Sequence, residues 1–224
     1  MKLLKSIAAT IVAWLIIIGA RLITGAKALG QVPVLCQSGR VYIANHTSHG
    51  DFVLLWASLP SAVRKQTRPV AGADYWQKGW LRRFIIEEVF RGVLIKRGGR
   101  EEGENPLLPL VEALAQQDSL ILFPEGTRNL TEPSKQALNP NVVPLQPFKP
   151  GLFHLLQQHP EVQCVPVWIA NVNRVMPKGR SLPLPLLCTV NFGEAFAMTA
   201  DEPKQIFLQR AQQKVSELAP GEAL

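Results

Sequence analysis

Short apolar runs typical of β-strands alternate with segments of helical periodicity along most of this 224-residue sequence. The strand-like runs are Val41–Ala44, Pro69–Ala73, Gly92–Lys96, Leu120–Phe123, Cys164–Ile169 and Leu186–Phe192. Between them, Asn105 as N-cap with Pro106 at the first helical position predicts one helix, Lys149–Gln158 a second, and a third follows Pro203. This alternation predicts a single α/β domain with a mostly parallel or mixed central sheet flanked by helices.

The N-terminus carries a separate apolar segment. Fifteen uncharged residues lie between Lys5 and Arg21, and Trp14 among them is a residue typical of membrane interfaces. A spanning helix needs roughly 20 apolar residues, so this segment is short for a full crossing. We therefore expect residues 1–30 to form a membrane-embedded or interfacial helical segment, and residues 31–224 to form the globular domain. The competing interpretation is a secretory signal, with Ala26-Lys27-Ala28 as its cleavage site.

The positive charge is concentrated in the first part of the chain. Residues 1–44 have a net charge of +5, residues 45–100 of +6 and residues 101–224 of −4. The basic part lacks the interleaved aromatic residues of a base-stacking surface, so we expect no nucleic-acid partner. An anionic membrane surface fits both the charge and the apolar N-terminus. The three cysteines have no paired spacing, which is compatible with a reducing compartment.

A polar turn follows the first predicted strand. It contains His46 and Asp51, which lie five positions apart and so suit a turn that brings the carboxylate back to the imidazole. A carboxylate that fixes the tautomer through one ring nitrogen leaves the other free to take a proton from an alcohol. This spacing predicts a general base. The alternative is a polar turn in which Asp51 merely favours the N-terminus of the next helix.

Two further segments could bind an anion. Residues 123–129 follow another apolar strand and offer Gly126, Thr127 and Arg128, a combination suited to a phosphate. Arg91–Arg100 forms a basic cluster around a short strand. The alternatives are an ordinary turn for the first segment and a solvated strand edge for the second.

A metal site is an alternative role for the same histidine. His46 and His49 have His-x-x-His spacing, and Asp51 could complete a triad. The other histidines are His154 and His159, and no distant cluster supplies further ligands. We therefore expect no metal.

The motifs together resemble a known family, the His-x4-Asp glycerolipid acyltransferases, and among them the lysophosphatidate (1-acylglycerol-3-phosphate) acyltransferases. The resemblance covers roughly residues 41–192. Four blocks occur in the family order: Asn45, His46, Ser48 and Asp51; Glu125–Arg128; Phe148, Lys149 and Gly151; and Val165–Val167.

The resemblance implies an O-acyltransferase that moves a fatty-acyl group from a thioester to the hydroxyl of a lysophosphatidate. His46 and Asp51 would be catalytic, and the acceptor would be bound by Asn45, Ser48, Arg97, Glu125, Gly126, Thr127, Arg128 and Lys149. Acyl-CoA or acyl carrier protein would be the co-substrate, and no other cofactor is expected. Because activated acyl donors are cytoplasmic, we expect the enzyme at the cytoplasmic face of a membrane, the inner membrane in a bacterium.

Other acceptors, such as a lyso-ornithine lipid or glycerol 3-phosphate, fit the same chemistry. An inactive membrane-binding module of the same fold is the alternative that lacks activity. One block departs from the family pattern. Arg97 can be matched to the arginine of the family's second block, but Arg91 stands in place of its glycine and Lys96 in place of its acidic residue.

Overall fold

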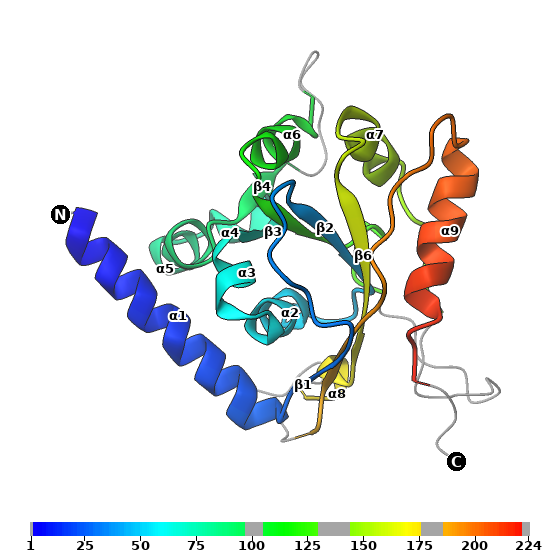
Figure 1. The fold of residues 1–224 in the computed structure, drawn as a ribbon. Helices are drawn as coiled ribbons and strands as arrows, with labels where there is room; N and C mark the ends of the chain where they lie inside the picture. Colours follow the sequence, from blue (N-terminus) through cyan, green and yellow to red (C-terminus); the bar gives the residue numbers. More distant parts are fainter. Residues whose placement is uncertain (1, 97–104, 130–143, 176–185, 221–224) are drawn as a thin grey trace.

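The computed structural model describes residues 2–96, 105–129, 144–175 and 186–220. A seven-stranded mixed sheet forms its centre, with the strand order β1-β7-β6-β2-β5-β3-β4 (Figure 1). The strands are β1 (Lys27–Gly30), β2 (Arg40–Ala44), β3 (Thr67–Gly72), β4 (Val93–Ile95), β5 (Ser119–Leu122), β6 (Gln163–Ala170) and β7 (Thr189–Phe192). All neighbouring strands pair in parallel except β6 and β7, which are antiparallel. The predicted α/β class with a mixed sheet is confirmed.

Helices cover both faces of the sheet (Figure 1). They are α1 (Lys2–Thr24), α2 (Asp51–Ser58), α3 (Ser61–Lys65), α4 (Ala73–Trp76), α5 (Trp80–Phe84), the π-helical turn η1 (Ile85–Val89), α6 (Leu108–Ala115), α7 (Gly151–Gln158), α8 (Val172–Val175) and α9 (Lys204–Ser216). Strand side chains alternate between the faces. Tyr42 and Ala44 of β2 pack in the core with α1, α2 and η1, whereas Val41 and Ile43 pack in the core with α6, α7 and α9.

The carboxyl ends of five parallel strands, β6, β2, β5, β3 and β4, lie at one end of the sheet. The register aligns Ile43 of β2 with Leu122 of β5, and Gly72 of β3 with Ile95 of β4. The polar turn after β2 and residues 123–129 after β5 are therefore brought together, although His46 and Glu125 are 79 positions apart in the sequence. Ligand sites in α/β sheets are usually built at this end.

Helix α1 lies along the domain beside α2 and η1 (Figure 1). One stripe of it, including Ala9, Val12, Ile16 and Ala20, packs on the core. The other side remains exposed and carries large apolar side chains, namely Leu3, Leu4, Ile7, Ile11, Trp14, Leu15 and Leu22. By length and composition this 23-residue helix could cross a membrane.

Two sequence expectations differ from the structure. Residues 27–30, expected in the N-terminal helical segment, form β1, because Gly25 adopts a positive φ of 53° that ends α1 and the chain then pairs with β7. The helix expected from Asn105 begins at Leu108, since the Asn105 side chain accepts a hydrogen bond from the Leu107 N–H and holds a turn there. The sequence also predicts a long loop over the proline-punctuated stretch Thr131–Pro150, and residues 131–143 of it lie outside the described residues.

Asn45 extends the pairing of β2 with β6 beyond the last backbone bond. Its buried amide donates to the Ile169 carbonyl at 2.9 Å and accepts from the Ile169 N–H at 2.7 Å. An apolar residue at position 45 would leave both backbone groups of Ile169 without partners, and such buried groups are costly.

We expect Asn45→Ala to lower the free energy of unfolding by about 2–4 kcal/mol. Asn191→Ala is the matched control, because the Asn191 amide donates one partly buried hydrogen bond, to the Leu218 carbonyl. That control should lose about 0.5–1.5 kcal/mol. Urea denaturation followed by circular dichroism measures both. Equal losses would contradict the structural role of Asn45.

Candidate active site

His46 lies in the turn directly after β2, and Asp51 is the first residue of α2. The imidazole Nδ1 lies 3.0 Å from Asp51 Oδ2, as the five-residue spacing predicted. The same oxygen accepts hydrogen bonds from the N–H groups of Thr47 at 2.6 Å and Ser48 at 2.8 Å. Asp51 is fully buried, and through these hydrogen bonds its carboxylate holds both the turn and the imidazole.

The imidazole is also held by an aromatic contact. Its ring stacks on Phe123 with a centroid separation of 4.2 Å, and Phe123 directly follows β5. The His46 side chain is 14% exposed, so its edge remains accessible. With Nδ1 bonded to a carboxylate and the ring fixed in orientation, Nε2 is the nitrogen that can accept a proton.

The Glu125 carboxylate joins the turn after β2 to the segment after β5. Its Oε1 accepts from the His46 N–H at 2.9 Å, and its Oε2 accepts from the Gln146 N–H at 2.9 Å and from the Asn129 amide at 3.3 Å. Burial raises the pKa of Glu125, while the bonds from the Gln146 and His46 N–H groups act in the opposite direction. Asn129 completes the connection, because its N–H donates to the His46 carbonyl at 2.7 Å.

Gly126 begins the exposed part of this segment. It has a φ of +76°, and a Cβ built there would lie 3.1 Å from Cγ of Lys149. Both the backbone conformation and the close approach therefore favour glycine. The Lys149 N–H donates to the Pro124 carbonyl at 2.8 Å, which holds the chain before α7 against the same turn.

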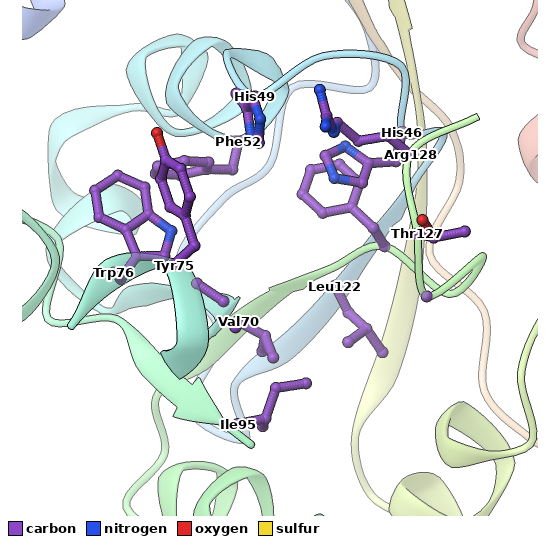
Figure 2. Close-up of a pocket in the computed structure, with 14 residues that line it drawn as sticks. His46, His49, Phe52, Val70, Tyr75, Trp76, Ile95, Leu122, Thr127 and Arg128 are labelled. Atoms are coloured by element: carbon purple, nitrogen blue, oxygen red, sulfur yellow. The ribbon is translucent and has the colours of Figure 1, made fainter. Parts of the chain in front are cut away.

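A cavity opens in front of His46 (Figure 2). Gly126, Thr127 and Arg128 contribute its polar side, and Figure 2 shows His46 and Arg128 together on one wall. The facing wall carries Tyr75 and Trp76 of α4. The remaining lining is mainly apolar and comes from Phe52, Val70, Ala71, Gly72, Ile95, Leu122 and Phe123, with His49 at the side. The arrangement places an imidazole held by a carboxylate, a guanidinium and an apolar surface around one space.

The residues expected at the site fall into three groups. His46, Gly126, Thr127 and Arg128 line the cavity. Asn45, Ser48, Asp51, Glu125 and Lys149 surround it without being part of its lining, and the first four use their side chains in hydrogen bonds to the protein itself. Arg97 lies outside the described residues.

Arg91 lies away from the cavity. Its guanidinium donates to the Lys65 carbonyl and pairs with Asp118 at 3.3 Å, and Asp118 precedes β5 at the opposite end of that strand from Phe123. Arg68 pairs with the same carboxylate at 3.1 Å. This part of the basic cluster is therefore a structural ion-pair group.

Sequence reasoning assigned no role to Asn129 or to the apolar walls. Asn129 directly follows the Glu125–Arg128 block, and this position next to a motif is the feature of the sequence that points to a role for it at the site. Residues such as Val70, Ile95 and Leu122 have no signal in the sequence, because an apolar strand residue that faces a cavity has the same pattern as one that faces the core. Among the described residues, no group of three or more His, Cys, Asp or Glu side chains could hold a metal ion.

The chain is similar to known proteins in fold and in sequence. Among solved structures, the fold is similar to the crystal structure of the 1-acyl-sn-glycerophosphate (LPA) acyltransferase PlsC from Thermotoga maritima. The TM-score is 0.67 at 19% sequence identity, and the match covers 97% of this chain and 83% of that chain. No curated protein sequence matches the chain. The acyltransferase family matches residues 23–170, which is more than half of the chain. The chain therefore belongs to the acyltransferase family.

Proposed function

We propose that the protein transfers a fatty-acyl group from an acyl thioester to the free hydroxyl of a lysophosphatidate, which gives phosphatidate. The observation that carries this proposal is the His46–Asp51 pair, 3.0 Å apart, on the wall of a cavity that Arg128 and apolar side chains also line. The cation suits a phosphate and the apolar wall suits an acyl chain. The similarity in fold to the LPA acyltransferase from Thermotoga maritima supports the same acceptor.

In the proposed reaction, His46 acts as a general base. Nε2 takes the proton of the acceptor hydroxyl while the oxygen attacks the thioester carbonyl carbon. The tetrahedral intermediate then collapses, the carbon–sulfur bond breaks, and the thiolate takes the proton from the imidazolium. The Asp51 carboxylate stabilises the imidazolium and keeps Nε2 directed at the cavity. No acyl-enzyme is required, because the acceptor itself is the nucleophile.

The acceptor phosphate is assigned to Arg128, with Thr127 and the Gly126 backbone beside it. Arginine can bind a phosphate through two parallel charge-assisted hydrogen bonds. Lys149, whose stem packs over Gly126, adds a positive charge near the same turn. Asn45, Ser48 and Glu125 support this surface through bonds to the backbone. We also propose Arg97 as an acceptor-binding residue, because the resemblance of the sequence to the family implies that role.

The enzyme is proposed to work on a membrane, at its cytoplasmic face, with acyl-CoA or acyl carrier protein as donor. The outward side of α1 carries large apolar residues, and the first hundred residues carry a net charge of +11. An interfacial helix with one face on the domain and the other in lipid accounts for both observations. An anionic bilayer would then supply the acceptor.

An acceptor panel tests the reaction itself. Lysophosphatidate, glycerol 3-phosphate and a lyso-ornithine lipid are each supplied with acyl-CoA and with acyl carrier protein, and products are identified by mass. We expect phosphatidate from lysophosphatidate to form fastest. Faster acylation of another acceptor would overturn the proposed substrate. Absence of any product would favour the inactive membrane-binding module.

The base is tested by His46→Ala, which should lower kcat by about 10²- to 10⁴-fold. Asp51→Asn should be impaired almost as strongly, because the neutral amide stabilises the imidazolium less well. His154→Ala serves as the control, since His154 is an exposed histidine on α7. Steady-state assays with matched thermal unfolding curves separate lost chemistry from lost folding. A near-normal rate for His46→Ala would rule out the mechanism.

Arg128→Lys separates binding from chemistry. Lysine keeps the charge but lacks the paired donors, so the acceptor KM should rise while the donor KM stays nearly unchanged. The loss of one such contact corresponds to roughly 1.5–3 kcal/mol, or about 10- to 100-fold in kcat/KM. Kinetics with each substrate varied in turn decide the assignment. A defect confined to the donor KM would move Arg128 to the phosphates of the acyl carrier.

A further inference from the structure

A short exposed segment beside the cavity carries large apolar side chains. Residues 77–83 are all exposed, and within them Trp80 is 80% and Leu81 is 53% exposed. Both belong to α5, a helix in which no residue is buried. Single exposed apolar residues are common on protein surfaces, but a tryptophan with four fifths of its surface exposed next to an exposed leucine is a marked patch.

Basic residues surround this patch. Lys78 precedes it, and Arg82 and Arg83 follow it, all exposed. Arg83 pairs with Glu87 at 2.9 Å, whereas the guanidinium of Arg82 lies over the Tyr75 ring at 4.5 Å. Tryptophan together with arginine and lysine is the combination found where proteins meet the headgroup region of a bilayer.

The patch lies between α1 and the cavity. α5 continues directly into η1, and η1 packs against α1. Towards the cavity, Trp80 lies four positions after Trp76, and Trp76 lines the cavity. Tyr75, under the Arg82 guanidinium, lines the cavity as well. A surface in contact with Trp80 would therefore also be next to the cavity wall.

We propose that Trp80 and Leu81, with Lys78 and Arg82, form a second membrane contact that inserts into the headgroup region of an anionic bilayer beside the cavity. This inference rests on the proposed function, because it assumes an acceptor that resides in the membrane. It deepens that function: an acceptor lipid would move laterally from the bilayer past Tyr75 and Trp76 to His46, with its acyl chain never crossing water.

A bilayer fits this patch better than an acidic carrier protein does. A protruding tryptophan needs a complementary pocket on a protein partner, whereas a fluid lipid interface adapts to its shape. The adjoining outward face of α1 is also apolar, which extends the same kind of surface. Docking of a carrier protein is nevertheless a distinct outcome of the experiments below.

Fluorescence quenching by brominated lipids tests the contact without requiring turnover. The full-length protein is added to vesicles of phosphatidylcholine and phosphatidylglycerol, with or without brominated acyl chains, and three variants are compared: Trp80→Phe, Trp14→Phe and Trp168→Phe. We expect part of the quenching to be lost in Trp80→Phe. Trp168→Phe should keep the full quenching, because Trp168 is buried in the core with α6, α7 and α9.

The Trp14→Phe variant separates this inference from the proposed membrane attachment through α1. Loss of quenching in Trp14→Phe but not in Trp80→Phe would leave α1 in the membrane and overturn the second contact. Unchanged quenching in both would overturn the membrane attachment as well. Vesicles of phosphatidylcholine alone should show weaker quenching of Trp80, since the basic residues then lack anionic partners.

An activity measurement gives the functional consequence. The double variant Trp80→Ser/Leu81→Ser should lower kcat/KM for a vesicle-embedded acceptor by about 10-fold, because the variant inserts less apolar side-chain surface into the lipid and so binds the vesicle more weakly. Its kcat/KM for a water-soluble short-chain acceptor should stay unchanged. Ile206→Ser on α9 is the matched control, because Ile206 is 53% exposed on the opposite face of the sheet. A defect seen only with acyl carrier protein as donor would identify a protein-docking surface and overturn the proposal.

Discussion

The buried carboxylate of Glu125 is the constraint on which the geometry of the site depends. It accepts hydrogen bonds from backbone N–H groups on two segments, at His46 and Gln146, and so joins the loops after β2 and β5 to the chain that leads into α7. The Asn129 N–H closes the connection through the His46 carbonyl. With its two backbone bonds fixed in this way, the His46 main chain has little freedom, and the imidazole needs only Asp51 and Phe123 to define its direction.

A carboxylate suits this position because several donors converge on its two oxygens. An amide at position 125 would offer one acceptor oxygen and turn a pair of donors towards the Gln146 N–H or the Asn129 amide. Burial works against the charged form and raises the pKa of Glu125. A carboxyl with a raised pKa in the folded state stabilises the fold fully below its unfolded pKa, and that contribution is lost as the pH rises through the folded value. The role of Glu125 is therefore to position the loops after β2 and β5 and the chain before α7 through its hydrogen bonds.

The sequence predicted those contacts of the candidate site that depend on a local spacing. His46 and Asp51 are close in the chain, so the turn that joins them could be inferred from their separation alone. The proximity of residues 45–51 to residues 123–129 could also be inferred, because each segment follows a strand and parallel strands bring their carboxyl ends together. The supporting roles of Asn45 and Glu125 were not predictable in this way. Their partners, Ile169 and Gln146, lie 124 and 21 positions away and contribute backbone groups, which no residue type reveals. Strand β1 escaped prediction for a related reason: four exposed residues pair with β7 at the sheet edge and leave no burial pattern in the sequence.

The attachment of α1 to the domain, at its C-terminal end and along its length, has a mechanical consequence. At its C-terminal end the helix passes into β1, the edge strand beyond β7, and along its length it packs on η1, near the opposite edge where β3 and β4 lie. A helix of 23 residues is about 34 Å long, comparable with the width of a small domain. A membrane helix joined by one flexible linker would let the domain swing and roll above the lipid. In the membrane attachment proposed above, the packed helix would instead fix the tilt of the domain, and with it the direction in which the cavity faces, while the protein moves along the bilayer.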